Sequence, residues 1–376
     1  MTPIEWFVAE TEEAWLELEP EWRALAACLG DPSLFATPEW HRVWWRHFGR
    51  GRSPRLAGAR RDGALIGLAP LCTKTGLGGV RIREWLGSEE ADWGGLLVAP
   101  GAEPMAPDLL GVALRDRRWD LVDLWCVPSG SEARVAWGSV IERSPLRHRE
   151  APQCQNPVLS LRTDEWMQGV RREQLGRKRR ALERQGALRL VLPDDGPGVA
   201  AALGDLRRLH VERWRQAGEI SRLTVPAYWD WVRDLALEAF RLGWLYLPRL
   251  ELDGRLVATG LFVLYRRRLF QWFNGHALEF ARHSPFLLLQ LAVIEHVRAA
   301  DCADCLDFGR GDEWYKSRWT DKATSLERLM AWRHVRGHAA QVWRGRIRPW
   351  AWSNPRWSRP VRRVKRVLRR LAPGVA

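Results

Sequence analysis

Four residues in the last third of the chain carry side chains that can move a proton or bind an anion. Asp307, Asp312, Tyr315 and Lys316 fall within ten residues of one another. A carboxylate can accept a proton, a phenol can donate one, and an ammonium group can hold a phosphate or a carboxylate. The other interpretation of residues 306–316 is an Asp–Gly turn beside a packed tyrosine and a solvated lysine.

The elements expected around this segment bring it to the end of a strand. We expect a strand at residues 305–308, so that Asp307 lies at its end and Asp312 lies in a Gly-flanked loop. Before it, Ser284-Pro285 is typical of an N-cap and first helical position, which predicts a helix to about residue 300. Other strands are expected at residues 244–252, 255–265, 269–274 and 325–332, and helices at 164–185, 199–217 and 224–242.

The first half of the chain has the same order of elements. Helices are expected at residues 12–29, 37–47 and 103–117, strands at 55–60, 64–73, 81–86, 94–98 and 120–125, and a linker at 152–157. Asp62-Gly63 and Asp253-Gly254 each stand between two β-like runs, which predicts two type I′ hairpins. Chance is the alternative, but the shared order of flanking elements favours a duplication.

Charge is concentrated at the C-terminal end of the chain. Residues 341–376 hold eleven of the 59 Lys and Arg residues and no Asp or Glu, so most of the formal charge of +14 belongs to this tail. One face of an expected helix holds Val361, Val364, either Val367 or Leu368, and Leu371, with basic residues opposite and tryptophans upstream. This pattern favours an anionic membrane surface; nucleic acid and a disordered basic tail are the alternatives.

The remaining composition is that of a globular, reduced protein. We find no secretory signal segment and no stretch of about 18 apolar residues, and we expect a cytoplasmic protein, peripheral at the inner face of the membrane if the tail binds there. Cys302 and Cys305 form a lone C-x-x-C among six cysteines. A structural zinc site needs four ligands and no second pair is present, so we expect no metal.

The order of elements and four short segments resemble the tandem-GNAT family of CelD/BcsL-like (cellulose-biosynthesis) acetyltransferases, relatives of the Fem-type aminoacyltransferases. The four segments are residues 35–48, 62–71, 86–97 and 283–316, and the resemblance covers about residues 16–332. It implies an α/β fold of two tandem GNAT-like domains, each a mainly antiparallel splayed sheet flanked by helices. The expected division is residues 1–155 (acceptor side), 156–338 (acyl-donor side) and a basic tail at 339–376.

The resemblance also implies an acyl-CoA co-substrate. In GNAT folds the N-terminus of the helix at 285–300 receives the pyrophosphate of coenzyme A. The donor-binding residues expected there are Arg282, Ser284, Pro285, Phe286 and Leu287. Relatives commonly carry Gly where this chain has Phe286, so its ring either obstructs close approach to the backbone or turns into the core.

The expected site has a catalytic and an acceptor-binding part. Asp307, Asp312, Tyr315 and Lys316 are the catalytic candidates. The acceptor-binding candidates are Trp40, Trp44, Asp92, Trp93, Trp272, Asn274 and Arg310. A tryptophan platform stacks well on a sugar ring, although helix-spaced tryptophans more often belong to a core.

Three functions are consistent with these patterns. The leading one is acyl-CoA-dependent N-acylation of a small envelope-related amine, such as an amino sugar, a lipid precursor or a polysaccharide intermediate. The first alternative is a Fem-type transferase that uses aminoacyl-tRNA, and the second is a non-catalytic GNAT scaffold associated with a membrane.

Overall fold

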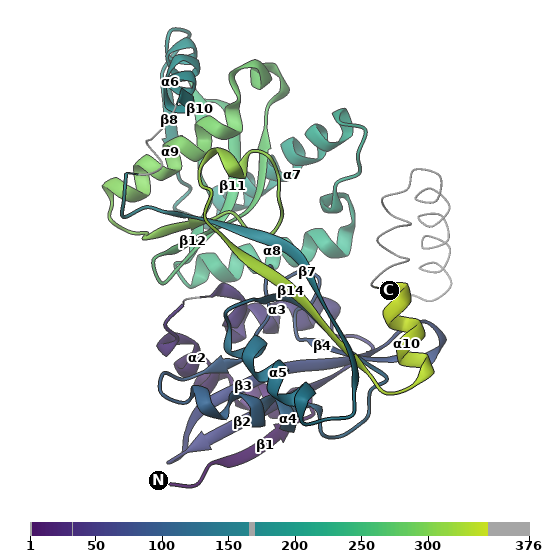
Figure 1. The fold of residues 1–376 in the computed structure, drawn as a ribbon. Coiled ribbons are helices and arrows are strands. Elements are labelled where there is room, and N and C mark those ends of the chain that lie inside the picture. Colours follow the sequence, from purple (N-terminus) through teal and green to yellow (C-terminus); the bar gives the residue numbers. More distant parts are fainter. Residues whose placement is uncertain (1, 32, 165–169, 345–376) are drawn as a thin grey trace. The chain divides into compact units, whose positions relative to one another are not determined.

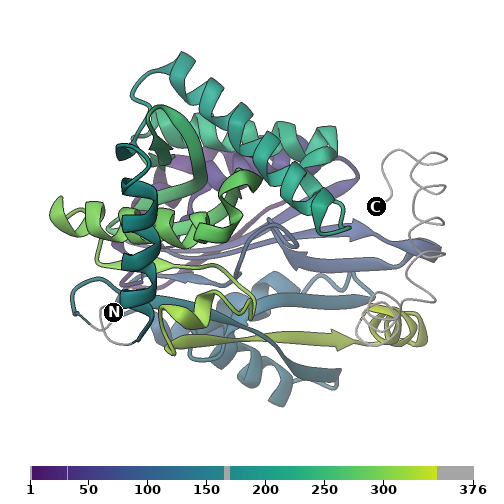
Figure 2. The same cartoon turned by 90° about the horizontal axis from the view of Figure 1, so that it is seen from above.

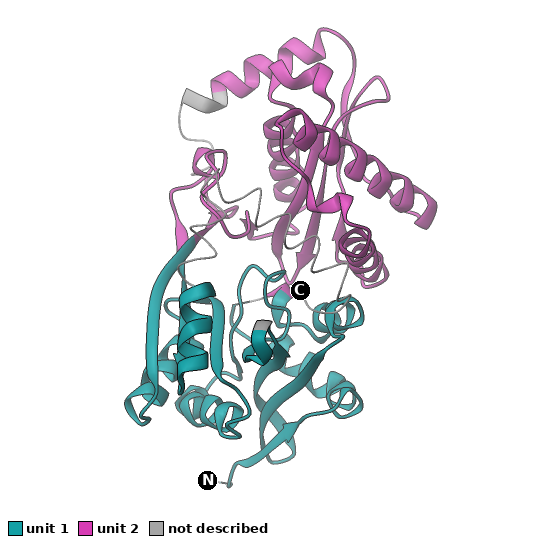
Figure 3. Ribbon diagram, turned by 90° about the vertical axis from the view of Figure 1, so that its right-hand side faces the viewer, with its two compact units in different colours: residues 1–31, 35–154, 325–376 teal, residues 32–34, 155–324 magenta. Residues whose placement is uncertain are grey.

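The computed structural model describes residues 2–31, 33–164 and 170–344. The chain divides into two compact units, drawn in different colours in Figure 3. Unit 1 contains residues 1–31, 35–154 and 325–376, and unit 2 contains residues 32–34 and 155–324. The chain crosses between the units within strand β7 (Arg147–Ser160) and again within strand β14 (Ala323–Trp332).

Unit 1 contains a mostly antiparallel sheet with helices packed on it (Figure 1). Its strands pair in the order β1 (Glu5–Ala9), β2 (Arg52–Arg61), β3 (Ala64–Thr75), β4 (Arg81–Trp85), β6 (Leu121–Pro128) and β14, and β5 (Leu97–Val98) pairs with β3. Its helices are α1 (Glu12–Glu17), α2 (Glu19–Cys28), α3 (Pro38–Phe48), α4 (Ala106–Leu114), α5 (Glu132–Glu142) and α10 (Val335–Val342). The pair β4–β6 is parallel.

Unit 2 repeats this plan with a second set of strands and helices. The strands pair in the order β7, β13 (Cys305–Asp307), β12 (Arg268–His276), β11 (Arg255–Tyr265), β10 (Arg249–Leu252) and β8 (Leu188–Val191), and β9 (Leu245–Tyr246) pairs with β11. The helices are α6 (Val170–Glu183), α7 (Gly196–Gln216), α8 (Pro226–Arg241) and α9 (Pro285–Ala299) (Figures 1 and 2). The pair β12–β13 is parallel. The α/β class with mainly antiparallel sheets and flanking helices is therefore confirmed.

The two expected hairpins are present and share an irregularity. Asp62 and Gly63 have φ of 52° and 78°, and Asp253 and Gly254 have 48° and 77°, as a type I′ turn requires. In the first hairpin the β2–β3 register skips Ile66, and in the second the β10–β11 register skips Val257. These two bulged residues occupy the same place in the repeated sequence. A β-bulge is a specific feature, so its recurrence supports duplication over chance.

The structure differs from the sequence prediction in three places. Residues 152–157 are part of β7 and not a linker, and Asn156 within them is fully buried. Residues 325–332 were expected in the second domain, but β14 pairs with β6, so they belong to unit 1. Strands β1 and β8 and helices α5 and α10 were not predicted. The amphipathic helix expected near the C-terminus lies outside the described residues.

Among the residues that the structure describes, no helix is both long enough and apolar enough to cross a membrane.

Candidate functional site

The parallel pair in unit 2 separates part of the way along β12. Strand β13 pairs with β12 only from Arg268 to Phe270, opposite Cys305 to Asp307, whereas β12 continues to His276. Within the described part of the chain, the β13 side of β12 beyond Phe270 therefore has no strand partner. The N–H and C=O groups of such an edge can pair with an extended ligand.

A β-bulge in β12 lies where the two strands separate. In the β11–β12 register, Leu261 is opposite Phe273 and Phe262 is opposite Gln271, so Trp272 is the extra residue. In a regular strand, Gln271 and Phe273 would lie on the same face of the sheet. The bulge places them on opposite faces. The Gln271 amide bonds to Gln290 of α9, whereas the Phe273 ring packs against His210 of α7.

Asp307, the last residue of β13, is a fully bonded carboxylate. It is 1% exposed. Its Oδ1 accepts hydrogen bonds from Nδ2 of Asn156 (3.0 Å) and from the backbone N–H of Gly309 (2.8 Å). Its Oδ2 accepts two from Arg268, at 3.0 Å from Nε and 2.7 Å from Nη2. This geometry joins β7, β12 and β13, and it favours a positioning role for Asp307 over the proton transfer expected from the sequence.

Lys316 is also buried and holds the loop that follows β13. Its Nζ donates to the carbonyl oxygens of Gly309 and Arg310, both at 2.9 Å, and of Gly311 at 3.4 Å. It also forms an ion pair with Glu313 at 2.8 Å. The sequence left a solvated lysine as the alternative to a catalytic one. The structure instead shows a buried ammonium group that holds the loop together through its hydrogen bonds to three backbone carbonyl oxygens.

The rest of this loop is joined to β7. The backbone N–H of Gly311 donates to the carbonyl oxygen of Gln155 (2.8 Å), and the N–H of Gln155 donates to Oδ1 of the exposed Asp312 (3.3 Å). Asp312 therefore lies on the outside of the loop. Of the four catalytic candidates, Tyr315 keeps the geometry best suited to proton transfer.

Tyr315 is held at the end of a chain of side-chain hydrogen bonds. Its hydroxyl oxygen accepts a hydrogen bond from Nε2 of Gln271 (3.4 Å), whose Oε1 accepts one from Nε2 of Gln290 (2.6 Å). The Oε1 of Gln290 in turn accepts one from Nε1 of Trp319 (2.9 Å). The Tyr315 oxygen accepts the hydrogen bond from Gln271, so the phenolic proton of Tyr315 is not donated to Gln271. The ring packs edge-to-face on Phe286, with centroids 5.6 Å apart.

The N-terminus of α9 gathers positive charge beside Phe286. Ser284 is the N-cap residue and Pro285 begins the helix, as the sequence predicts. The backbone of Ser284 has φ of 53°, and its side chain makes no capping hydrogen bond; its Oγ instead accepts a hydrogen bond from Nζ of Lys178 (2.5 Å). The Nε of Arg282 donates to Nε2 of His283 (3.0 Å). Burial, Arg282 and Lys178 lower the pKa of His283. Among the described residues, neither Lys178 nor Arg282 has a carboxylate partner.

These features suit an anion. Because Pro285 lacks an N–H, the N–H groups of Phe286 and Leu287 are the first that the helix leaves without intrahelical acceptors. The helix dipole adds partial positive charge at the same end. Two cations without carboxylate partners add to this positive potential, which favours the approach of a phosphate or a carboxylate.

The three tryptophans expected to bind the acceptor in unit 1 belong to its core. Trp40 and Trp44 are fully buried, and Trp93 is 9% exposed. Phe35 packs edge-to-face on Trp40, and Nε1 of Trp44 donates to Glu90 (3.2 Å). In this structure the two fully buried rings offer no face to a sugar, which corrects the expectation. Helix α3 places its tryptophans inward because its apolar stripe must be covered.

The remaining acceptor candidates are partly buried. Asp92 lies in unit 1, Trp272 packs edge-to-face on Trp231 with centroids 5.1 Å apart, and the Arg310 carbonyl is bonded by Lys316. The carbonyl oxygen of Asn274 accepts a hydrogen bond from His210 (2.7 Å). The sequence prediction missed Gln271, Gln290 and Arg213. The sequence does contain a signal for Gln290, because it is a polar residue inside the otherwise apolar run 285–294.

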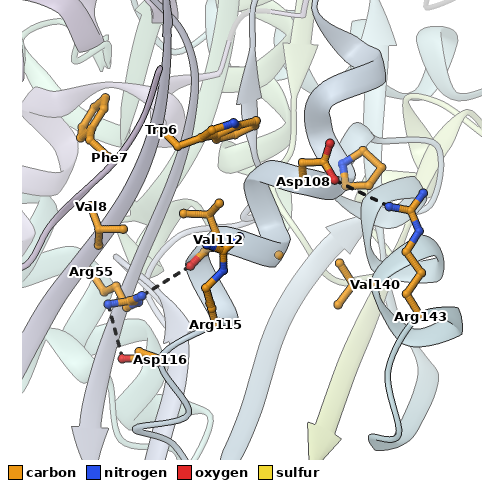
Figure 4. A pocket seen from close by; sticks show the side chains of 12 residues that line it. Trp6, Phe7, Val8, Arg55, Asp108, Val112, Arg115, Asp116, Val140 and Arg143 are labelled. Carbon is orange, nitrogen blue, oxygen red and sulfur yellow. Dashed lines mark hydrogen bonds and ion pairs between the residues drawn. The ribbon is translucent and has the colours of Figure 1, made fainter. Parts of the chain in front are cut away.

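A cavity of about 770 Å³ lies in unit 1, between β1, β2, α4 and α5 (Figure 4). Trp6, Val112 and Val140 line it, with charged residues at its rim. Four of these charged residues are already engaged. Arg55 donates to the carbonyl of Ala113 (3.0 Å) and pairs with Asp116 (3.4 Å), and Arg143 pairs with Asp108 (3.6 Å). The carboxylates of Asp108 and Asp116 in this lining are therefore both paired with arginines.

Residues 169–317, which lie within unit 2, match the family described as "Acetyltransferase (GNAT) domain". No curated protein sequence matches the chain. Similar solved structures include FemX (12% identity, covering 89% of this chain and 98% of that chain, TM-score 0.62). They also include the C-terminal domain of a putative lysylphosphatidylglycerol synthetase from Agrobacterium fabrum (10%, 87% and 95%, 0.54) and a conserved protein from Bacteroides thetaiotaomicron (11%, 89% and 100%, 0.55).

At these identities the likeness concerns the fold. It extends over nearly the whole of the chain, beyond the residues that match the domain family. The narrower CelD/BcsL resemblance is not among these matches. Among the described residues, no group of three or more His, Cys, Asp or Glu side chains is arranged to hold a metal ion.

Proposed function

We propose that the chain transfers an acyl group from an acyl-CoA thioester to the amino group of a small acceptor. One relationship carries this proposal: the strand edge of β12 that β13 leaves unpaired lies in the same unit as the cationic N-terminus of α9, which follows β12 in the chain. Together they offer backbone pairing for an extended chain of amides and a site for a pyrophosphate. Acyl-CoA combines these two chemical features.

The residues present are suited to this donor. The edge beyond Phe270 can pair with the amides of a pantetheine arm. Lys178, Arg282 and the N–H groups at the start of α9 can bind the phosphates. Phe286 stands where relatives commonly have Gly, but its ring packs on Tyr315 and within the unit 2 core, which supports the interpretation that it turns away from the helix N-terminus.

The reaction asks three things of the protein. An acceptor ammonium group, with a pKa near ~10.4, must lose a proton before its nitrogen attacks. Backbone N–H groups of the β12 edge can stabilise negative charge on the carbonyl oxygen. Tyr315 can then supply a proton to the departing sulfur. A bound acyl thioester contributes the electrophilic carbonyl, and no metal is needed.

The acceptor class rests on the sequence resemblance. An amino sugar, a lipid precursor or a polysaccharide intermediate of the cell envelope remains our proposal. The basic tail at 341–376 would bring the enzyme to the anionic inner face of a membrane, where such acceptors are made. Nucleic acid is the less favoured partner of this tail.

A second donor has one observation in its favour. FemX shares the fold over 98% of its own length, and the Fem-type resemblance implies aminoacyl-tRNA as donor. Basic residues of α6 lie beside α9, since Lys178 bonds Ser284 and Arg179 pairs with Glu295 (2.8 Å). The same surface could meet a tRNA backbone.

The test is a thiol-release assay on the full chain with acetyl-CoA and longer acyl-CoAs against a panel of amines. Mass spectrometry of ligands retained on the purified protein runs in parallel. Acceptor-dependent release of CoA, with an acylated amine of matching mass, supports the proposal. Turnover only with aminoacyl-tRNA would replace the donor. No turnover with either donor, and no retained CoA species, would favour a non-catalytic scaffold.

A further inference from the structure

Three buried polar atoms near the end of β12 lack hydrogen-bond partners. They are Nε of Arg213, Nε1 of Trp214 and Nδ1 of His276. Leaving such an atom unsatisfied costs about 1–3 kcal/mol, so native proteins rarely tolerate one without a reason. These three lie close together, on the adjoining elements α7 and β12.

The packing of α7 on β12 brings these residues together. A Cβ on Gly275 would lie 2.8 Å from both the backbone N of His210 and Cβ of Leu209, so helix and strand are in backbone contact there. Nδ1 of His210 also bonds the carbonyl oxygen of Asn274 (2.7 Å). Arg213 and Trp214 follow His210 by one helical turn, and His276 follows Gly275 directly.

Packing between aromatic rings holds Trp214 in place where α7 meets β12. The His210 and Trp214 rings lie 5.7 Å apart, and His210 packs edge-to-face on Phe273 at the same distance. Trp214 is therefore held on the α7 surface next to the strand. Its indole N–H is a donor only, as is Nε of Arg213, whereas a neutral imidazole nitrogen can accept.

Arg213 is a charged residue where α7 packs on β12, and the two histidines beside it are neutral. Burial and the nearby Arg213 lower the pKa of His276 to about 4, so its imidazole is neutral at pH 7. Burial also lowers the pKa of Arg213, and the Tyr315 phenol opposes this shift. His210 is neutral too, because burial lowers its pKa to about 4. Among the described residues, Arg213 has no carboxylate partner.

We propose that the acceptor is an amine that also carries a phosphate or a carboxylate, which Arg213 and Trp214 bind while His276 receives the proton of the amine. This inference deepens the proposed acyl transfer and rests on it. A guanidinium and an indole N–H together provide two donors for one anionic group. The anion fixes the molecule, and the unpaired Nδ1 of His276 then faces its amino group.

The proton balance is complete without another reactant. The acceptor ammonium gives one proton to Nδ1 of His276. The neutral amine forms the C–N bond to the acyl carbon as the C–S bond breaks. The second amine proton replaces the proton that Tyr315 gives to the sulfur, so the products are an amide and a thiol, and His276 returns its proton to solvent.

The test compares acceptors that differ only in the anion. Glucosamine 6-phosphate and glucosamine separate the effect of a phosphate, and L-alanine and ethylamine separate that of a carboxylate. We expect at least about a tenfold lower KM for one anionic member of a pair, and Arg213→Gln should remove that preference. Arg215→Gln, an exposed position on the same helix, is the matched control and should keep it.

Binding provides a readout that does not depend on turnover. In NMR titrations of the full chain, inorganic phosphate should raise the pKa of His276, because an anion at Arg213 offsets the positive field. Trp214→Phe should weaken phosphate binding and His276→Gln should not. Unchanged His276 titration in saturating phosphate would overturn the inference, as would equal acylation of the charged and uncharged amines.

These outcomes differ from failure of the proposed function. If acyl-CoA binds and uncharged amines are acylated as well as anionic ones, the acyl transfer stands and the anionic acceptor is wrong. If no acyl-CoA binds while phosphate still shifts the titration of His276, the anion site stands and its role in acyl transfer is wrong.

Discussion

The guanidinium of Arg268 donates two hydrogen bonds to Oδ2 of Asp307, from Nε at 3.0 Å and from Nη2 at 2.7 Å. Arg268 begins β12 and Asp307 ends β13, so this pair ties the two parallel strands together over the whole of their short contact. Beyond it the strands separate. The buried ion pair therefore fixes the point at which the edge of β12 becomes available.

Asp307→Asn should have a larger effect on the free energy of unfolding than on kcat. Removing one partner of a buried ion pair leaves the other uncompensated, at a cost of about 3–5 kcal/mol. Urea unfolding of the variant should show this loss, and kcat per folded molecule should fall by less than about tenfold. A variant of full stability that has lost turnover would show that Asp307 is the base after all.

Lys316→Met should loosen the loop at residues 309–311. Three carbonyl oxygens lose their shared donor, and Glu313 loses its partner. Hydrogen exchange of the amides from Gly309 to Gly311 should become faster. The exposed Lys322→Met serves as the control and should leave these amides unchanged. Unaltered exchange in Lys316→Met would mean that the ammonium does not hold the loop.

The sequence located this segment, but it could not show the bonding partners of Asp307 and Lys316. Asp307 and Lys316 are residue types that do chemistry, and nothing in their spacing tells that one is saturated by Arg268 and the other faces three carbonyls. The hairpins at Asp62 and Asp253 were predictable because a type I′ turn is a local property. The β12 bulge and the β14–β6 pairing were not, because both depend on contacts between distant parts of the chain.

Tyr315→Phe should slow departure of the thiol. If the phenol protonates the sulfur, kcat with acetyl-CoA should fall by about 10²–10⁴, with little change in KM. An acyl thioester of thiophenol, whose leaving group needs no proton, should be much less affected. Gln271→Leu should show the same pattern more weakly, since Gln271 only positions the hydroxyl. Equal losses with both thioesters would exclude Tyr315 as the acid.

Acid should destabilise both units below about pH 6.5. Burial lowers the pKa of His41 to about 3 and that of His210 to about 4, from an ordinary value of 6.5. As the pH falls below 6.5, the unfolded chain binds protons that the folded chain does not, so stability decreases down to these values. Unfolding at pH 7.5 and pH 5 measures the difference. His210→Gln should reduce it, and an unchanged pH dependence in this variant would contradict the assignment.

The most direct test of the proposed donor is calorimetry of acetyl-CoA and desulfo-CoA binding to the full chain. We expect saturable binding of both ligands, weakened at least about tenfold in the Lys178→Gln, Arg282→Gln double variant. Arg233→Gln, which removes an exposed arginine of α8, should bind like the parent chain. Absence of binding by any CoA species, or equal affinity in the double variant, would contradict a donor site at the N-terminus of α9.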